Sequence, residues 1–182
     1  MTIKSFFAGF GGQGIVSLGQ IWAYLAMRQG KKVSFFPSYG AEKRGGHSQA
    51  GVVVSDEEIA SPLVTCPDSA LVMDGASLAL GERSLKEGGI LLVNSSLVKE
   101  APQRKDIRVV MLDLQGIALR VGNVRFANMV ALGAMARLTG AFMLKNIEAI
   151  LTKFFPPEKH KFIPDNVRAI EAGWNAADAI TV

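Results

Sequence analysis

The sequence contains a single cysteine, Cys66, among 182 residues. One thiol excludes an intrachain disulfide, and it excludes an iron–sulfur or zinc site built from cysteines alone. The two histidines, His47 and His160, lie far apart in the chain and show no metal-ligand spacing. We therefore expect no catalytic thiol and no metal site in this chain, and a reducing compartment around it.

A hydrophobic run long enough to cross a membrane is also missing. The least polar stretch, residues 129–144, contains Arg137 and falls short of the roughly 20 apolar residues that a membrane span needs. No secretory signal is evident, since residues 3–7 lead directly into a glycine-rich segment. These absences predict a soluble, cytoplasmic protein without membrane contact.

What the sequence does have is apolar content and a mild positive charge. Hydrophobic residues make up 49% of the chain, the mean hydropathy is +0.25, and the net charge is +4 with a pI near 9.3. This composition excludes a disordered chain and leaves apolar surface for a partner protein. The charge favours anionic ligands, but it is too small to indicate a nucleic-acid partner.

The pattern of apolar runs and breaks predicts one α/β domain over residues 1–182. Strands are expected at 3–8, 32–36, 49–55, 70–73, 90–93 and 109–112, and helices at 15–28, 76–86, 114–121, 126–139 and 144–154, with a last helix around 167–174. Strand, glycine-rich turn, helix and strand within the first 36 residues form a βαβ unit. We expect a Rossmann-like fold with a mostly parallel central sheet and helices on both faces. The helix at 126–139 is apolar on nearly all sides, which indicates either deep core or a subunit contact.

The turn after the first strand has the spacing G-x-G-x-x-G at Gly9, Gly11 and Gly14, with Gly12 and Gln13 between them. Glycines there allow positive φ and let backbone N–H groups approach an anion at the helix N-terminus. The same pattern also occurs in tight turns that bind nothing, and both interpretations stay open.

A typical dinucleotide site would place an acidic residue at the end of the second strand to bind a ribose hydroxyl. That position holds Phe35, Phe36 and Pro37, and no acidic residue precedes Glu42. The first βαβ unit therefore suits phosphate but disfavours NAD.

The segment 38–47, which follows the second strand, combines an aromatic ring, opposite charges and three glycines. Arg44 can form paired hydrogen bonds with a carboxylate or phosphate, and Glu42 can orient it. The alternative is a solvated loop with a local ion pair.

Three stretches of this sequence together resemble the gamma subunit of 2-oxoacid:ferredoxin oxidoreductases, over essentially the whole chain. They are residues 9–14, residues 37–46 and residues 59–62. The second stretch is most similar to the 2-oxoglutarate and branched-chain enzymes, with Lys43 departing from the neutral residue expected there. The resemblance implies a cofactor-binding role, without catalytic or metal-binding residues, for Gly9, Gly11, Gly12, Gln13, Gly14, Tyr39, Glu42, Arg44, Gly45 and Gly46.

The resemblance also implies a division of labour between chains. Alpha and beta subunits would hold the 2-oxoacid, thiamine diphosphate with Mg²⁺ and a 4Fe–4S cluster, often with a delta subunit, and ferredoxin would accept the electrons. This chain would help to bind or enclose coenzyme A (CoA), would have no activity alone, and when isolated could pair with a second copy of itself.

Two alternatives remain from the sequence. One is a stand-alone nucleotide- or flavin-binding module, which accounts for the glycine turn but not for residues 39–46. The other is the equivalent subunit of an indolepyruvate ferredoxin oxidoreductase, which differs only in its substrate.

Overall fold

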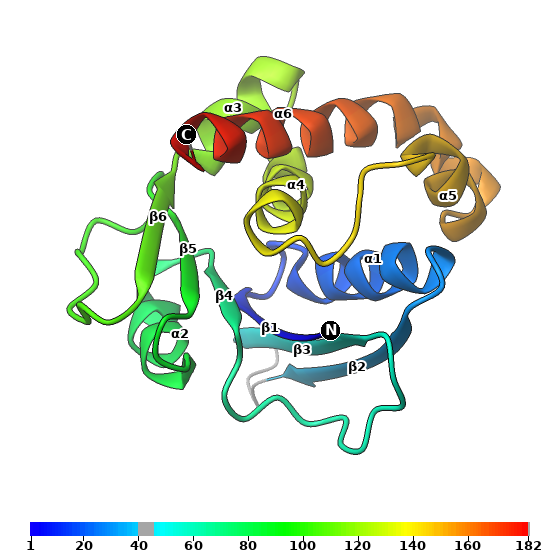
Figure 1. Cartoon of the computed structure of the whole chain (residues 1–182). Helices are drawn as coiled ribbons and strands as arrows, with labels where there is room; N and C mark the ends of the chain where they lie inside the picture. Colours follow the sequence, from blue (N-terminus) through cyan, green and yellow to red (C-terminus); the bar gives the residue numbers. More distant parts are fainter. Residues whose placement is uncertain (40–45, 182) are drawn as a thin grey trace.

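The fold is organised around one six-stranded sheet, shown in Figure 1. The computed structural model describes residues 1–39 and 46–181. Its strands are β1 (Thr2–Phe10), β2 (Lys32–Tyr39), β3 (His47–Ser55), β4 (Ser69–Val72), β5 (Ile90–Asn94) and β6 (Arg108–Leu112). All six predicted strands are present, several of them longer than expected.

The strand order is β2-β3-β1-β4-β5-β6. β1, β4, β5 and β6 pair in parallel, whereas β3 is antiparallel to both of its neighbours. β2 therefore runs in the same direction as β1 without pairing with it. The mostly parallel α/β class is confirmed, but β3 lies between the two strands of the predicted βαβ unit.

Helices α1 (Ile15–Arg28) and α3 (Leu114–Val121) have the bounds that the sequence predicts. The others are α2 (Leu78–Ser84), α4 (Ala127–Thr139), α5 (Ile147–Phe154) and α6 (Ile163–Thr181), with 3₁₀ turns η1 (Gly75–Ser77), η2 (Val124–Phe126) and η3 (Pro157–Phe162). α5 begins three residues later than expected because Asn146, at its N-cap, adopts a left-handed conformation with φ 55°. None of the described helices has both the length and the apolar composition that crossing a membrane requires.

The helices cover the two faces of the sheet unequally. Side chains alternate across each strand, so Leu71 and Leu92 join the large core under α1 and α3–α6. Val72 and Val93 point the other way, into a small cluster with Leu78 of α2. In Figure 1, α4 lies between the sheet and α6, and α2 lies on the opposite side of the sheet.

The apolar helix α4 forms part of the core, which settles the choice between core and subunit contact for most of its surface. Nine of its thirteen residues are buried. α6 crosses it at two glycines that face backbone. A Cβ placed on Gly133 would overlap the carbonyl of Ile170, and one placed on Gly173 would overlap the carbonyl of Val130. The two helix backbones are therefore in direct contact, and neither position has room for a methyl group.

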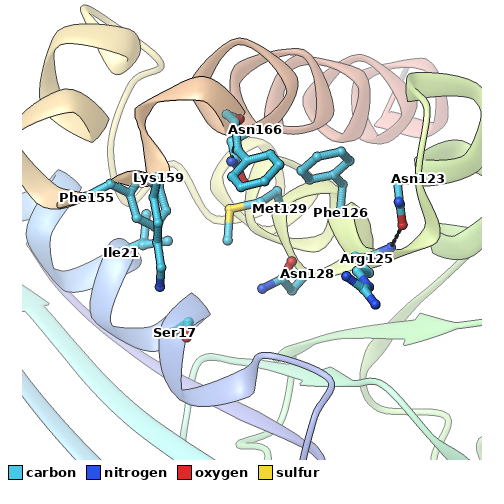
Figure 2. A pocket seen from close by; sticks show the side chains of 11 residues that line it. Ser17, Ile21, Asn123, Arg125, Phe126, Asn128, Met129, Phe155, Lys159 and Asn166 are labelled. Carbon is cyan, nitrogen blue, oxygen red and sulfur yellow. Dashed lines mark hydrogen bonds between the residues drawn. The ribbon is translucent and has the colours of Figure 1, made fainter. Parts of the chain in front are cut away.

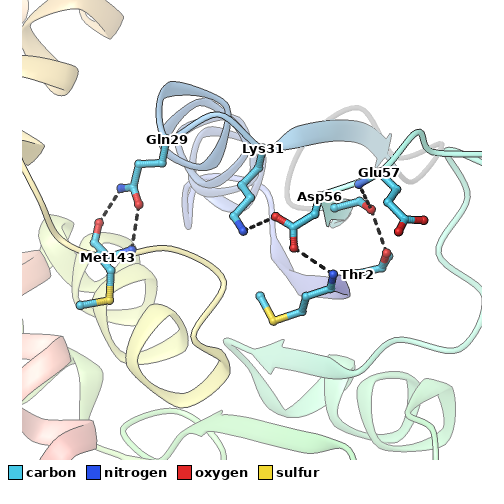
Figure 3. A network of polar contacts seen from close by, with 8 residues as sticks. Thr2, Gln29, Lys31, Asp56, Glu57 and Met143 are labelled. Atoms are coloured by element: carbon cyan, nitrogen blue, oxygen red, sulfur yellow. Dashed lines mark hydrogen bonds and ion pairs between the residues drawn. The ribbon is translucent and has the colours of Figure 1, made fainter.

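A second set of contacts joins the chain terminus to the sheet (Figure 3). The Asp56 carboxylate accepts hydrogen bonds from the Met1 ammonium at 2.8 Å and from Lys31 Nζ at 2.5 Å. Both donors lower the pKa of Asp56 to about 2, with the Lys31 hydrogen bond as the largest cause. Nearby, the Gln29 side chain pairs with the backbone N–H and carbonyl of Met143, linking the end of α1 to the segment before α5.

The helix crossing predicts that Gly133→Ala destabilises the fold. Alanine would gain about 1 kcal/mol of intrinsic helix propensity, but overpacking against a backbone carbonyl costs about 1–3 kcal/mol or more. We expect urea unfolding to show a net loss of about 1–2 kcal/mol. Asn175→Ala, an exposed change on α6, is the control and should be neutral or slightly stabilising. An unchanged Gly133→Ala midpoint would contradict the close crossing.

The Asp56 contacts predict a pH-dependent contribution to stability. Because the folded-state pKa is about 2, below the ordinary value of 3.8, the contribution is present above pH 3.8 and is lost as the pH falls toward 2. Asp56→Asn should therefore lower the free energy of unfolding slightly at pH 7, and the difference from wild type should vanish near pH 2. Glu57→Gln, next to it and exposed, should show no such trend.

Candidate functional site

The glycine turn lies at the carboxyl edge of the sheet, between Phe10 at the end of β1 and the start of α1. Gly12 has φ +97° and Gly14 has φ +75°, a region that favours glycine. No side chain caps α1, and its first turn contains no acidic residue. The first N–H groups of a helix have no partner within the helix. This end of α1 is therefore open to an anion.

Gln13 fixes the shape of the turn. Its Oε1 accepts a hydrogen bond from the Phe10 N–H at 2.7 Å, and its Nε2 donates to the Met73 carbonyl at 3.5 Å. A Cβ on Gly9 would lie 2.5 Å from that same Oε1. Gly9 thus makes room for the Gln13 side chain, which connects the turn to the end of β4.

The end of the second predicted stretch, residues 37–46, lies beside this turn. The Gly11 N–H donates to the Gly46 carbonyl at 2.9 Å, and the rings of Phe10 and His47 stack with centroids 5.5 Å apart. In the sheet, Ser48 pairs with Gly9 on one side and with Tyr39 on the other. The structure therefore places Gly46 in contact with the turn, whereas the backbone of Tyr39 is separated from Gly9 by strand β3. The other three predicted residues, Glu42, Arg44 and Gly45, lie outside the described residues.

A cavity of about 350 Å³ opens at the turn. Gly12, Gln13 and Gly14 form one wall, and the others are Met73, Gln115, Val124, Arg125, Ala127 and Asn128. Asn128 Nδ2 donates to the Gly14 carbonyl at 3.4 Å, and a Cβ on Gly14 would overlap this amide. Sequence analysis did not identify Arg125 or Asn128, because neither belongs to a motif and both are more than 100 residues from the turn.

None of the described residues that line the cavity at the turn is acidic. The expected ribose-binding position lies on β2, which β3 separates from β1, so a carboxylate there would not be next to the glycine turn. Asp74 follows β4 and is 4% exposed, with Oδ1 accepting from the Ser77 N–H at 3.0 Å. Its Oδ2 has no hydrogen-bond partner among the described residues. In the same part of the chain, no three His, Cys, Asp or Glu side chains gather as a metal site would require.

Comparison with known proteins identifies the family. The family profile described as "Pyruvate ferredoxin/flavodoxin oxidoreductase" matches residues 4–176. The chain belongs to this family. Ketoisovalerate oxidoreductase subunit VorA from Methanothermobacter thermautotrophicus is 39% identical over 168 residues, which are 91% of this chain and 34% of that protein. The chain thus spans about a third of the length of the curated relatives that it matches first.

Solved structures of this oxidoreductase family agree with the fold. The keto/oxoacid ferredoxin oxidoreductase gamma subunit from Geobacter sulfurreducens PCA has a TM-score of 0.83 and 32% identity, covering 97% of this chain and 99% of that one. The resemblance to gamma subunits is therefore confirmed. The 2-oxoglutarate:ferredoxin oxidoreductase from Magnetococcus marinus, solved with 2-oxoglutarate, coenzyme A and succinyl-CoA bound, has a TM-score of 0.85. It is 24% identical, covers 98% of this chain and 31% of that one, and at this identity shows a shared fold.

The role of Gln13 predicts a measurable loss when its acceptor is removed. Gln13→Leu leaves the Phe10 N–H without a partner, and we expect the free energy of unfolding to fall by about 1 kcal/mol. Amide hydrogen exchange at Phe10 should become faster. Gln20→Leu, an exposed change on α1, is the control. If both variants behave alike, Gln13 does not hold the turn.

Proposed function

We propose that this chain is the gamma subunit of a multi-subunit, thiamine-dependent 2-oxoacid:ferredoxin oxidoreductase and that its glycine turn takes part in binding CoA. In the proposed reaction a 2-oxoacid loses CO₂, an electron pair passes to ferredoxin, and the acyl group joins the CoA thiol. Alpha and beta subunits, with a delta subunit in some enzymes, are the proposed partners. The chain alone is expected to be inactive.

The observation that carries the CoA proposal is the open, acid-free end of α1 at the glycine turn. A phosphate there would meet unpaired N–H groups and the positive end of the helix dipole. Gly12 leaves open space on the cavity side, with nothing within 4 Å of where its Cβ would be, and Arg125 adds a cation to the same cavity. These residues fit the diphosphate of CoA. Coenzyme A is also bound in the Magnetococcus marinus enzyme, which shares this fold.

This chain's residues can hold and orient CoA, and the remaining cofactors are assigned to the partners. CoA, when bound, supplies the thiol that accepts the acyl group. The turn would fix its phosphate end, and Asn128 would keep the Gly14 backbone in place through its hydrogen bond. Thiamine diphosphate, Mg²⁺ and the 4Fe–4S cluster are assigned to the alpha and beta subunits. This sequence contains one cysteine, and its Asp74-Gly75 lacks the leading glycine of the Gly-Asp-Gly motif of thiamine enzymes.

The role of residues 37–46 and the class of substrate are also proposed. Tyr39, Glu42, Arg44, Gly45 and Gly46 are proposed to contribute to the same site, supported by the contact between Gly11 and Gly46. The relatives act on different 2-oxoacids, ketoisovalerate and 2-oxoglutarate among them, so we propose a 2-oxoacid without choosing one. Family membership favours a subunit over a stand-alone flavin or nucleotide module.

The proposal is tested by placing a charge on the turn. Gly12→Asp and Gly12→Asn share the same backbone strain at φ +97° and nearly the same shape, so they differ mainly in one negative charge. A carboxylate at a helix N-terminus opposes an anionic ligand by about 0.3–1 kcal/mol, a roughly two- to fivefold effect. We expect the assembled enzyme with Gly12→Asp to have a KM for CoA higher by that factor than the enzyme with Gly12→Asn.

The rate of 2-oxoacid decarboxylation in the absence of CoA is the internal control and should be the same for both variants. Equal KM values for CoA would show that the turn does not bind the phosphates of CoA. Equal losses in both half-reactions would instead assign the turn to the thiamine-bearing site, and 2-oxoacid oxidation by this chain alone would overturn the subunit proposal.

A further inference from the structure

Helix α1 borders cavities at both of its ends. The cavity drawn in Figure 2 shares Arg125 and Asn128 with the cavity at the glycine turn, so it belongs to the site described above. Another cavity, of about 490 Å³, lies at the far end of α1 and shares no described lining residue with those two. Because α1 has 14 residues, its two ends are about 20 Å apart. We refer to this separate cavity as the α1-end cavity.

Two hydrogen bonds hold the walls of the α1-end cavity together. Gln29, at the end of α1, donates from Nε2 to the Met143 carbonyl at 2.6 Å. The Met143 N–H donates to Gln29 Oε1 at 3.0 Å, so the two residues are joined by a pair of bonds (Figure 3). This pairing holds the segment that carries Lys145 next to the end of α1. The cavity is therefore already formed in the free chain and does not have to be assembled by a ligand.

The described lining of this cavity contains three cations and no acidic residue. Arg28 comes from the last turn of α1, Lys145 from the segment before α5, and Lys153 from the last turn of α5. All three are exposed, and none forms an ion pair with a carboxylate of the described residues. Glu148, in the first turn of α5, lines a neighbouring cavity instead. An anion in the α1-end cavity would therefore meet three positive groups without a competing carboxylate.

Helix ends account for the position of two of these cations but not for the third. Arg28 and Lys153 lie in the last turns of their helices, where the negative end of the helix dipole favours a cation. Lys145 precedes Asn146, the N-cap of α5, and so lies at the positive end of that helix. In the free chain its charge is opposed by the helix dipole and by the two other cations of the cavity. A bound anion would remove this repulsion.

We propose that the α1-end cavity binds a small ligand that carries two or more phosphate groups. Its volume lies within the range of about 300–1,000 Å³ that is typical of small-molecule sites. Arg28 can hold one phosphate through two parallel hydrogen bonds, while the ammonium groups of Lys145 and Lys153 attract others as point charges. The described lining contains no aromatic ring, so the ligand is recognised by its phosphates and not by a base. This site does not depend on the function proposed above.

The test is a titration of the purified full-length chain with inorganic tripolyphosphate at constant ionic strength, followed through the backbone amide signals in NMR spectra. We expect the signals of residues 28–31 and 144–150 to shift and to saturate. The signals of Gly12 and Gly14 report on the glycine turn, about 20 Å away, and so separate binding there from binding in the α1-end cavity. Sodium chloride at the same ionic strength should give no saturable shift, since it only screens the charges.

Lys145→Gln tests the cation whose position the helices do not explain. It should weaken tripolyphosphate binding by roughly three- to tenfold, the range expected for one charged partner at an exposed site. Without the anion, its thermal unfolding midpoint should equal or slightly exceed that of wild type, because the variant removes a cation from the positive end of α5. Lys105→Gln is the matched control: it removes an exposed lysine outside the described lining of the cavity and should bind tripolyphosphate as wild type does.

Arg28→Lys separates a fitted site from general attraction between opposite charges. It keeps the net charge but removes the planar fork, so weaker binding of tripolyphosphate by this variant supports paired hydrogen bonds to a phosphate. The proposal is overturned if tripolyphosphate shifts no signals or only those of the glycine turn, or if Lys145→Gln and Arg28→Lys both bind it as tightly as wild type. Tighter binding of citrate, an anion with three carboxylates, would overturn the assignment to phosphate groups.

Discussion

The close crossing of α4 and α6 is the constraint on which the packing of the helical layer depends. Gly133 and Gly173 each face a backbone carbonyl of the opposite helix, so the two helices can contact only in this register. This contact sets the position of each helix relative to the other. The start of α4 carries Asn128, whose hydrogen bond to the Gly14 carbonyl supports the glycine turn. A packing requirement in the core thereby positions polar groups at the surface.

The antiparallel strand β3 has an equally direct effect on the glycine turn. Because β3 pairs with β1, its start lies next to the turn, where the Gly46 carbonyl accepts a hydrogen bond from the Gly11 N–H. In a typical dinucleotide-binding sheet the second strand pairs directly with the first, and an acidic residue at the end of that second strand binds a ribose hydroxyl. In this chain the strand next to β1 is β3 and not β2, so the glycine turn adjoins the start of β3 and not the end of the second strand.

Much of the fold could be predicted from the sequence because its signals are local. The apolar spacing over α1 and the glycine before it define that helix, and Asp113 before α3 caps it by accepting from the Gly116 N–H at 2.9 Å. The pairing of β3 could not be predicted, since a run of valines indicates a strand without indicating its neighbours. The close approach of Gly133 to α6 is likewise invisible in the sequence, where a glycine within a helix indicates only a mild destabilisation.

In the candidate site, too, only the residues that are contiguous in the sequence could be predicted. Gly9–Gly14 form a contiguous motif, so their placement at the start of α1 could be predicted. Arg125 and Asn128 come from η2 and the start of α4, more than 100 residues later in the sequence, and only the packing of α4 against α1 brings them to the turn. The described lining of the cavity at the turn contains one cation, Arg125, and no carboxylate. Such a lining suits the binding of an anion and offers no acid–base pair, so the proposed function assigns the chemistry on the acyl group to partner subunits.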